Sequence, residues 1–187
     1  MKKEDIKRHL QDYSIYNKRK TTINHAFASA LSVADSFDEN KINDALRILG
    51  QDPNGDLKCA YCDKPAETWD HIKAVVKDSE FSGHGHQISN LIPCCKNCNS
   101  KKGNMEWETF LKQKKLDTTD RIQKIKNYIS QDLSNLIEIL NENCKDDLVE
   151  FNKIKEQVFI LLKQGDEKAT IIRNKIRKIK KMNNNDR

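Results

Sequence analysis

Two Cys-x-x-Cys pairs constrain the fold of this chain more than any other feature of its sequence. Cys59 and Cys62 form the first pair, Cys95 and Cys98 form the second, and 32 residues separate the two pairs. Two such pairs supply four thiolates, which give Zn²⁺ a closed tetrahedral site of the structural kind. We therefore expect a zinc site that fixes both ends of the intervening segment, so that metal binding contributes to folding.

Two further cysteines and two histidines are alternatives to this ligand set. Cys94 in place of Cys95 would change the second spacing to Cys-x-x-x-Cys, so the sequence favours Cys95 and predicts that Cys94 faces a small core. Cys144 lies in a helical region and is predicted to be a buried or unreactive thiol. His84 and His86 lie in a glycine-containing loop, and two complete cysteine pairs leave no coordination position for them.

The composition of the 187-residue chain indicates a soluble protein. Charged residues make up 33% of the sequence, and no apolar run approaches the length of a membrane span. The first residues, MKKEDIKRHL, are basic, but the apolar segment of a secretory signal does not follow them. We expect a cytoplasmic, reducing location, where clustered cysteines bind metal rather than form disulfides.

The net charge of +6 comes from the C-terminal segment. Residues 163–187 contain nine Lys or Arg and three Asp or Glu, whereas the other 162 residues contain 25 of each sign. A basic segment on a neutral body attracts phosphate, although a charge run by itself more often covers a solvated helix face. The side chains predicted to contact nucleic acid here are Arg173, Lys175, Arg177, Lys178, Lys180 and Lys181.

Hydrophobic periodicity predicts helices on both sides of the cysteine-rich centre. Residues 1–58 carry apolar stripes for three helices, of which the first includes Ile6–Tyr13. The third is predicted to begin after a cap at Asp38 and to end at Gly50. Further helices are expected from residue 120 onward, with a break at Gly165. One of their stripes comprises Ile122, Ile125, Ile129, Leu133, Leu136 and Leu140.

Between the two cysteine pairs, the spacing of apolar residues changes from the helical period to that of short extended segments. Short extended segments are expected around residues 68–76 and 88–93, separated by the loop that contains His84 and His86. Residues 99–102 are expected to lie in a short helix that ends at Gly103.

A set of polar residues in this central region has the spacing of a known catalytic motif. Asn90-Leu91 follows nineteen residues after the His71 of Asp70-His71, and Cys95-x-x-Cys98-Asn99-x-x-Lys102 closes the set. The combination resembles the HNH endonuclease family, the ββα-metal nucleases, from Cys59 to Asn104. The chain departs from the family pattern in having Asn99 in place of a final His and in lacking a proline shortly after Asp-His-Ile.

The resemblance implies an α+β fold that is mostly helical, with a central zinc-stapled ββα-metal cassette. The expected organisation is an N-terminal helical segment over residues 1–58, the nuclease cassette with structural zinc over residues 59–115, and a C-terminal helical segment with the basic tail over residues 116–187. It also implies hydrolysis of phosphodiester bonds in DNA, leaving 5′-phosphate and 3′-hydroxyl ends.

The resemblance further implies a role for each polar residue of the motif. His71 is the expected general base, since the pKa of an imidazole lies near neutral pH. Asp70 and Asn99 are expected to supply oxygen ligands to one catalytic Mg²⁺ or Mn²⁺. Asn90 is expected to brace the loop that holds His71 in position.

The expected partner is DNA, in double-stranded form. Lys101 and Lys102 follow Asn99 on the helix and are expected to hold the phosphate next to the cut. The apolar face of the C-terminal helices predicts a homodimer. A compact cassette without repeated DNA-reading modules favours a restriction or defence nuclease.

Two other classes of function remain alternatives. A non-catalytic zinc-dependent protein that binds DNA would retain the zinc site and the basic tail. A protein-interaction module built on the C-terminal helices would leave Asp70, His71 and Asn99 without a purpose. The sequence leaves open whether one strand or both are cut, and whether DNA or RNA is the substrate.

Overall fold

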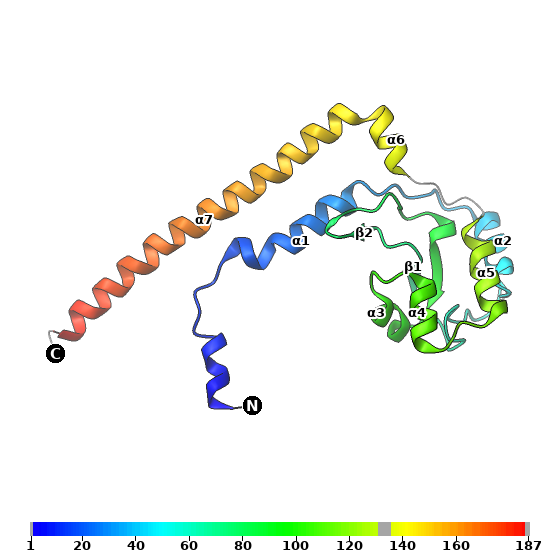
Figure 1. Ribbon diagram of the computed structural model, residues 1–187, viewed down its shortest axis with the longest axis horizontal. Coiled ribbons are helices and arrows are strands. Elements are labelled where there is room, and N and C mark those ends of the chain that lie inside the picture. Colours follow the sequence, from blue (N-terminus) through cyan, green and yellow to red (C-terminus); the bar gives the residue numbers. More distant parts are fainter. Residues whose placement is uncertain (1, 131–135, 186–187) are drawn as a thin grey trace. The chain divides into compact units, whose positions relative to one another are not determined.

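The computed structural model describes residues 2–130 and 136–185, and Figure 1 shows its elements in chain order. The chain divides into two compact units. The first comprises Met1–Asn24 and Asp146–Arg187, and the second comprises His25–Lys145. The three segments expected from the sequence have other boundaries, and they remain a prediction.

In the first unit, the N-terminal segment packs against the long C-terminal helix α7 (Lys145–Asn185). The carboxylate of Asp166 accepts hydrogen bonds from the backbone N–H groups of Ile15 and Tyr16 at 2.7 and 3.0 Å, where α1 (Ile15–Ala30) begins. These N–H groups have no partner inside their own helix, so a side chain on α7 caps α1.

The second unit is built around two antiparallel strands, β1 (Thr68–His71) and β4 (Leu91–Cys94). The register places Asp70 opposite Ile92 and His71 opposite Leu91. A second, two-residue hairpin pairs β2 (Val76–Lys77) with β3 (Glu80–Phe81). The paired strands therefore bring the Asp-His dipeptide next to the segment that follows Asn90.

Short helices surround the paired strands. The 3₁₀ helix η2 (Ile88–Asn90) leads directly into β4, and α3 (Lys96–Lys102) follows that strand. Helix α3 ends at Gly103, whose φ of +49° lies in a region that favours glycine. The remaining helices of this unit are α2 (Glu39–Ile48), α4 (Trp107–Lys114), α5 (Thr119–Ile129) and α6 (Leu136–Asn143).

The main core of the second unit lies where these helices meet β1 and β4. Its largest fully buried side chains include Tyr61, Tyr128 and Phe110. The Tyr128 hydroxyl on α5 donates to the carbonyl oxygens of Ile88 and Leu91, and so fixes the entry to β4. The cysteines at positions 59, 94, 95 and 98 belong to the same core, so packing and the metal-ligand region are continuous.

The α+β, mostly helical fold predicted from the sequence is confirmed. Asp38 caps α2 by accepting a hydrogen bond from the N–H of Lys41 at 3.1 Å, and Gly50 follows the helix with a φ of +74°. The predicted helix over residues 99–102 is part of α3, which ends at Gly103 as expected.

Two expectations for the helices differ from the structure. Ile6–Tyr13 do not form a core helix: η1 (Lys3–Arg8) is a short 3₁₀ helix, and Ile6 and Tyr13 are more than half exposed. The predicted break at Gly165 is wrong, because α7 continues through it. A Cβ there would lie 3.5 Å from Ile15, an ordinary contact, so the position does not require a glycine. The cost of a glycine inside a helix, about 1 kcal/mol, is too small to end α7 here. Leu133 lies outside the described residues.

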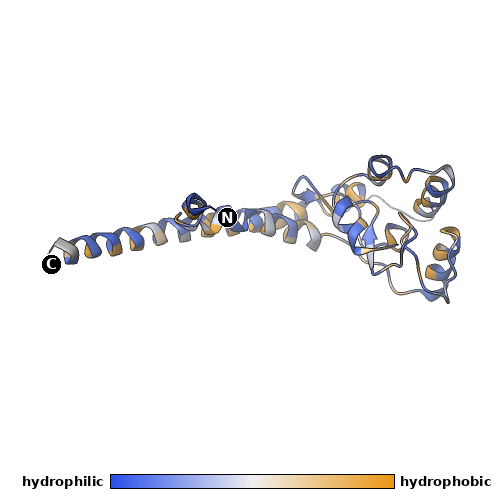
Figure 2. Ribbon diagram, turned by 90° about the horizontal axis from the view of Figure 1, so that it is seen from below, coloured by the Kyte–Doolittle hydropathy of each residue, from blue (hydrophilic) through white to orange (hydrophobic). Residues whose placement is uncertain are grey.

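Among the described residues, no helix is long and apolar enough to cross a membrane. The longest helix, α7, has 41 residues, and its sequence alternates apolar and charged positions. Figure 2 shows hydrophilic and hydrophobic stretches alternating along its length.

Candidate active site and four-cysteine centre

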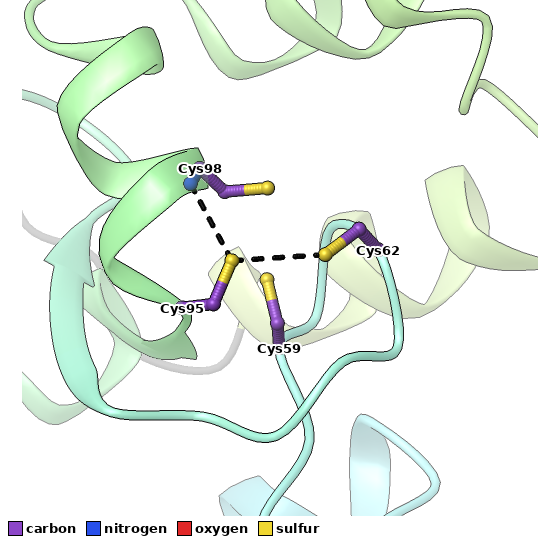
Figure 3. Close-up of side chains that lie close together, drawn as sticks. All are labelled: Cys59, Cys62, Cys95 and Cys98. Carbon is purple, nitrogen blue, oxygen red and sulfur yellow. Dashed lines mark hydrogen bonds between the residues drawn. The ribbon is translucent and has the colours of Figure 1, made fainter.

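The four cysteines of the two Cys-x-x-Cys pairs converge on one point (Figure 3). The Sγ atoms of Cys59, Cys62, Cys95 and Cys98 all lie within 4.8 Å of one another, and those of Cys62 and Cys95 are 3.7 Å apart. Tetrahedral Zn–S bonds of about 2.3 Å separate the sulfur atoms by roughly 3.8 Å. The four-cysteine centre thus has the dimensions of a zinc site.

Local backbone geometry directs the cysteines toward this point. Cys59 and Cys62 lie in a tight turn, in which the N–H of Asp63 donates to the carbonyl oxygen of Cys59 at 2.9 Å. Asp63 has a φ of +62°, which closes the turn. Cys95 is the N-cap of α3, and its Sγ accepts the backbone N–H of Cys98 at 3.4 Å.

The electrostatics of the four-cysteine centre favour a bound cation. Burial raises the pKa of the Cys62 and Cys98 thiols. The neighbouring Cys94 thiol lowers the pKa of Cys59 to about 4. Four thiolates held this close together repel one another, and a divalent cation would balance their charge.

Cys94 lies beside this centre and is fully buried, as predicted. Its Sγ is 3.9 Å from that of Cys59, but it is not one of the four cysteines that converge. The geometry therefore supports Cys95 rather than Cys94 as the fourth cysteine of the centre.

A second set of polar residues lines a cleft of about 330 Å³ in the second unit. Asp70 and His71 come from the end of β1, and Asn99 comes from α3. The lining also includes His86, which the sequence analysis assigned no role. Three residues of the motif therefore face one solvent-accessible space, whereas the four cysteines form a separate, closed centre.

The imidazole of His71 is partly buried in this cleft. Burial, together with the neighbouring His86 and Lys102, lowers its pKa to about 4. His71 is therefore neutral at pH 7, which is the state that a general base requires. Its Nε2 lies 2.8 Å from Nδ1 of His86.

Asp70 is held by two buried neighbours. Its Oδ2 accepts hydrogen bonds from the Tyr61 hydroxyl at 2.8 Å and forms an ion pair with the Lys102 ammonium at 3.0 Å. Burial raises the pKa of the Asp70 carboxyl, and both neighbours oppose that shift. Both of these contacts fall on Oδ2.

Lys102 does not lie on the surface as a phosphate ligand would. Its side chain is 0% exposed, and its Nζ also donates to the carbonyl oxygen of His71 at 2.7 Å. The neighbouring Lys101 is exposed. The structure therefore places the two adjacent lysines in different surroundings, one inside the protein and one in solvent.

Asn90 is completely buried and connects two segments of backbone. Its Oδ1 accepts the N–H of Lys73 at 2.8 Å, and its Nδ2 donates to the carbonyl oxygens of Lys73 and Gly85 at 3.0 Å each. Its own carbonyl accepts the N–H of Ile72 at 2.9 Å. These bonds hold the chain on the C-terminal side of His71, and they support the bracing role expected for Asn90.

Asn99 and the predicted DNA-binding residues of the basic tail differ in the contacts that their side chains make within the protein. The Nδ2 of Asn99 donates to the carbonyl oxygen of Trp69 at 3.4 Å, so the amide lies beside β1. In the first unit, Arg173 and Arg177 both form ion pairs with Asp12. The side chains of the four other predicted contacts are exposed, namely Lys175, Lys178, Lys180 and Lys181.

Tyr61 and His86 are site residues that the sequence did not predict. Tyr61 follows Cys59 by two residues and gives no signal apart from its position in the cysteine turn. His86 precedes Asn90 by four residues, and only the paired strands bring it to His71.

Comparison with known proteins gives one match. A family model described as HNH endonuclease matches residues 59–105, the segment that contains both the four-cysteine centre and the cleft residues from Asp70 to Asn104. No curated protein and no solved structure matches the chain. The chain therefore contains an HNH endonuclease domain, which spans residues 59–105 and includes the four-cysteine cluster.

Proposed function

We propose that this protein is a metal-dependent endonuclease that hydrolyses phosphodiester bonds of DNA, of the restriction or defence type. The observation that carries the proposal is the cleft in which His71, Asp70 and Asn99 meet. A neutral imidazole and two oxygen donors in one space are the groups that such a reaction needs.

The catalytic metal fits the residues present. The Asp70 carboxylate and the Asn99 amide offer oxygen donors, which Mg²⁺ and Mn²⁺ prefer. The raised pKa of the buried Asp70 reflects a carboxylate short of solvation, and a cation would supply the missing stabilisation. When bound, the metal offsets charge on the phosphate and on the leaving oxygen.

His71 is the proposed general base. It takes a proton from water as the water oxygen forms its bond to phosphorus and the bond from phosphorus to the 3′ oxygen breaks. The 3′ oxygen then gains a proton from solvent, which leaves a 5′-phosphate and a 3′-hydroxyl. Asn90 acts on this step only through the backbone that it holds.

The proposed DNA contacts lie in both units. Lys101 is exposed on α3, and the lysines on the tail of α7 are exposed as well, so they are available to phosphate. Lys102 would reach phosphate only by leaving Asp70, and its contacts argue instead for a role in holding that carboxylate. Arg173 and Arg177 are partly neutralised by Asp12.

We also propose a homodimer formed through α7. Five of the exposed apolar residues of α7 recur at steps of 7, 11, 4 and 3 residues, which bring these five to one face. They are Ile154, Leu161, Ile172, Ile176 and Ile179. The N-terminal segment packs against other positions of α7, such as Phe159 and Asp166. An apolar face of this kind suits a second copy of the same helix.

A non-catalytic zinc-dependent DNA-binding protein is the second candidate. It is favoured by the Lys102 ammonium, which occupies one oxygen of Asp70, because a positive charge there disfavours a second cation. The two candidates differ in product: binding without cleavage under Mg²⁺ or Mn²⁺ supports this one.

The proposal is tested by His71→Ala in a cleavage assay on duplex DNA with Mg²⁺. Removal of the general base should lower the cleavage rate by about a hundredfold or more, while zinc content and DNA binding stay at the wild-type level. Asp78→Ala, on the turn between β2 and β3, is a matched control and should cut normally. Cleavage by His71→Ala at the wild-type rate would refute the assignment.

A further inference from the structure

His86 contacts His71, the proposed general base, although it is not one of the residues that define the HNH motif. Its Nδ1 is 2.8 Å from Nε2 of His71, and the ring centroids are 4.9 Å apart with the ring planes at 58°. Both imidazoles line the cleft that contains Asp70 and Asn99. The separation of the two nitrogens corresponds to one hydrogen bond.

Neighbouring segments fix the backbone at His86. Its N–H donates to the carbonyl oxygen of Val33 at 2.9 Å, and its own carbonyl oxygen accepts the N–H of Asp35 at 3.2 Å. A Cβ on Gly85 would come within 2.2 Å of the Val33 carbonyl oxygen, so only glycine fits before His86 without a shift. Asn90 also donates to the carbonyl oxygen of Gly85 at 3.0 Å. The imidazole of His86 is thus carried on a constrained backbone although its side chain is exposed.

The direction of the hydrogen bond between the rings decides whether His71 can accept a proton. A neutral imidazole carries one N–H, and its other nitrogen is an acceptor. If His86 donates, the hydrogen of His71 stays on Nδ1 and neither nitrogen of His71 is free. If His71 donates through Nε2, its Nδ1 is a free acceptor. A general base needs an unprotonated nitrogen, so only the second arrangement is active.

We propose that His86 is a positioning residue for His71, an inference that rests on the function proposed above. The Nδ1 of His86 accepts the hydrogen on Nε2 of His71 and holds that ring in the tautomer whose Nδ1 takes the proton from water. The proton of His86 stays on its own Nε2, so His86 leaves the step unchanged. The ring of His86 also limits rotation of the His71 imidazole, which keeps the free nitrogen directed into the cleft.

The test compares His86→Ala and His86→Asn with the wild-type chain. Alanine removes the acceptor, whereas asparagine restores one, because its Oδ1 is attached to Cγ as Nδ1 is in histidine. His86→Ala should lower kcat for duplex cleavage with Mg²⁺ by about a hundredfold, the scale set by a misplaced catalytic group, with KM for DNA unchanged. His86→Asn should recover most of that loss. His9→Ala, which removes an exposed histidine of the first unit, is the matched control and should cut normally.

A second readout does not depend on activity. The ¹⁵N chemical shifts of the His71 ring, measured by NMR at neutral pH, report which nitrogen carries the hydrogen. The inference predicts hydrogen on Nε2 in the wild-type chain and in His86→Asn, and a mixture of tautomers in His86→Ala. This measurement on the wild-type chain needs no variant, so it holds even if an alanine at position 86 disturbs folding.

Three results would overturn the inference. They are wild-type kcat in His86→Ala, hydrogen on Nδ1 of His71 in the wild-type chain, and loss of Mn²⁺ binding by calorimetry in His86→Ala, which would make His86 a metal ligand. Absence of cleavage by the wild-type chain under every divalent metal would overturn the proposed function and this inference with it. Wild-type cleavage with an unaffected His86→Ala would overturn the inference alone.

Discussion

Lys101 and Lys102 are adjacent on α3, yet their side chains have different environments. Lys101 is exposed, whereas Lys102 is buried and contacts Asp70 and the carbonyl oxygen of His71. Both lysines were expected from the sequence to hold the phosphate next to the cut. At the scale of single residues, burial leaves Lys101 accessible to a proposed phosphate contact and keeps Lys102 inside the protein.

The first prediction uses this pair of lysines as mutual controls. Lys102→Ala leaves Asp70 as a buried charge without its partner and should lower the free energy of unfolding by about 3–5 kcal/mol. Lys101→Ala should leave stability unchanged and reduce the salt dependence of DNA binding by about one unit of slope. Urea unfolding and binding titrations at several salt concentrations measure the two effects. A stable Lys102→Ala with weakened DNA binding would show that Lys102 contacts phosphate.

The identity of the site residues was largely predictable from the sequence, but their environments were not. Residue type and spacing were enough to select Asp70, His71 and Asn99, because the motif repeats known chemistry at known intervals. The burial of Lys102 depends on where Tyr61 and Asp70 meet across the core. The contact of His86 with His71 depends on strand pairing, and neither kind of contact is periodic in sequence.

At the scale of elements, the four-cysteine centre joins the turn at Cys59 and Cys62 to the start of α3. The cleft residues lie on β1 and α3, the elements whose ends this centre fixes. Zinc should therefore act on catalysis only through the geometry of these elements, because a four-thiolate site has no open position.

The second prediction compares the adjacent cysteines. Cys95→Ser removes a ligand and should lower zinc content to well below one ion per chain, with loss of cooperative unfolding. Cys94→Ala removes only a buried thiol beside the centre and should keep zinc fully bound. Elemental analysis of the purified variants measures both. Equal zinc contents in the two variants would contradict the ligand assignment.

The third prediction concerns the cap that α7 provides for α1. The N–H of Ile15 is the main cause of the lowered pKa of Asp166, followed by Tyr16 and Ser14. Because the folded-state pKa of Asp166 is lowered, the cap contributes its full stabilisation at pH values above the unfolded-state pKa of about 3.9. This stabilisation is lost as the pH falls through the folded-state pKa. Asp166→Asn should therefore reduce protection of the Ile15 and Tyr16 amides at pH 7 and have little effect at pH 2.

Amide hydrogen exchange measures the protection at Ile15 and Tyr16. Glu167→Gln, the adjacent position on α7, is the matched control and should change it at neither pH. A cap that is equally strong at pH 7 and pH 2 would contradict the role of the Asp166 carboxylate.

Elements with local stop and start signals were predictable, and those set by tertiary contacts were not. Asp38 and Gly50 bound α2 because a side-chain cap and a positive φ are local properties. Helix α7 continues through Gly165 because a glycine inside a helix costs only about 1 kcal/mol, and tertiary contacts hold the helix on both sides of it. Phe159 packs against Tyr16, and Arg173 pairs with Asp12. The cap by Asp166 joins residues more than 140 positions apart, beyond the range of local patterns.

At the scale of the whole molecule, the basic tail and the nuclease domain lie in different units. The net charge of +6 comes from residues 163–187, but Asp12 pairs with Arg173 and Arg177 and reduces the charge that remains for DNA. Of the tail residues predicted to contact DNA, the exposed lysines at positions 175, 178, 180 and 181 have no such ion pair with Asp12.

The fourth prediction tests whether these lysines attract DNA. Replacement of all four by Gln should reduce the slope of log K against log salt by up to about 3.6, since each neutralised phosphate contributes about 0.9. Replacement preserves the Asp12 ion pairs and the Asp166 cap, which a truncation of residues 164–187 would remove. An unchanged slope, measured by fluorescence anisotropy with a duplex, would show that the tail is a solvated helix face.

The domain over residues 59–105 is proposed to cut DNA in the cleft at His71. The most direct measurement is incubation of the wild-type chain with supercoiled plasmid and Mg²⁺ or Mn²⁺, followed by sequencing of the product ends. We expect nicked or linear DNA with 5′-phosphate and 3′-hydroxyl ends, and no product in EDTA. Intact plasmid under both metals, with DNA bound and zinc in place, would contradict the proposal.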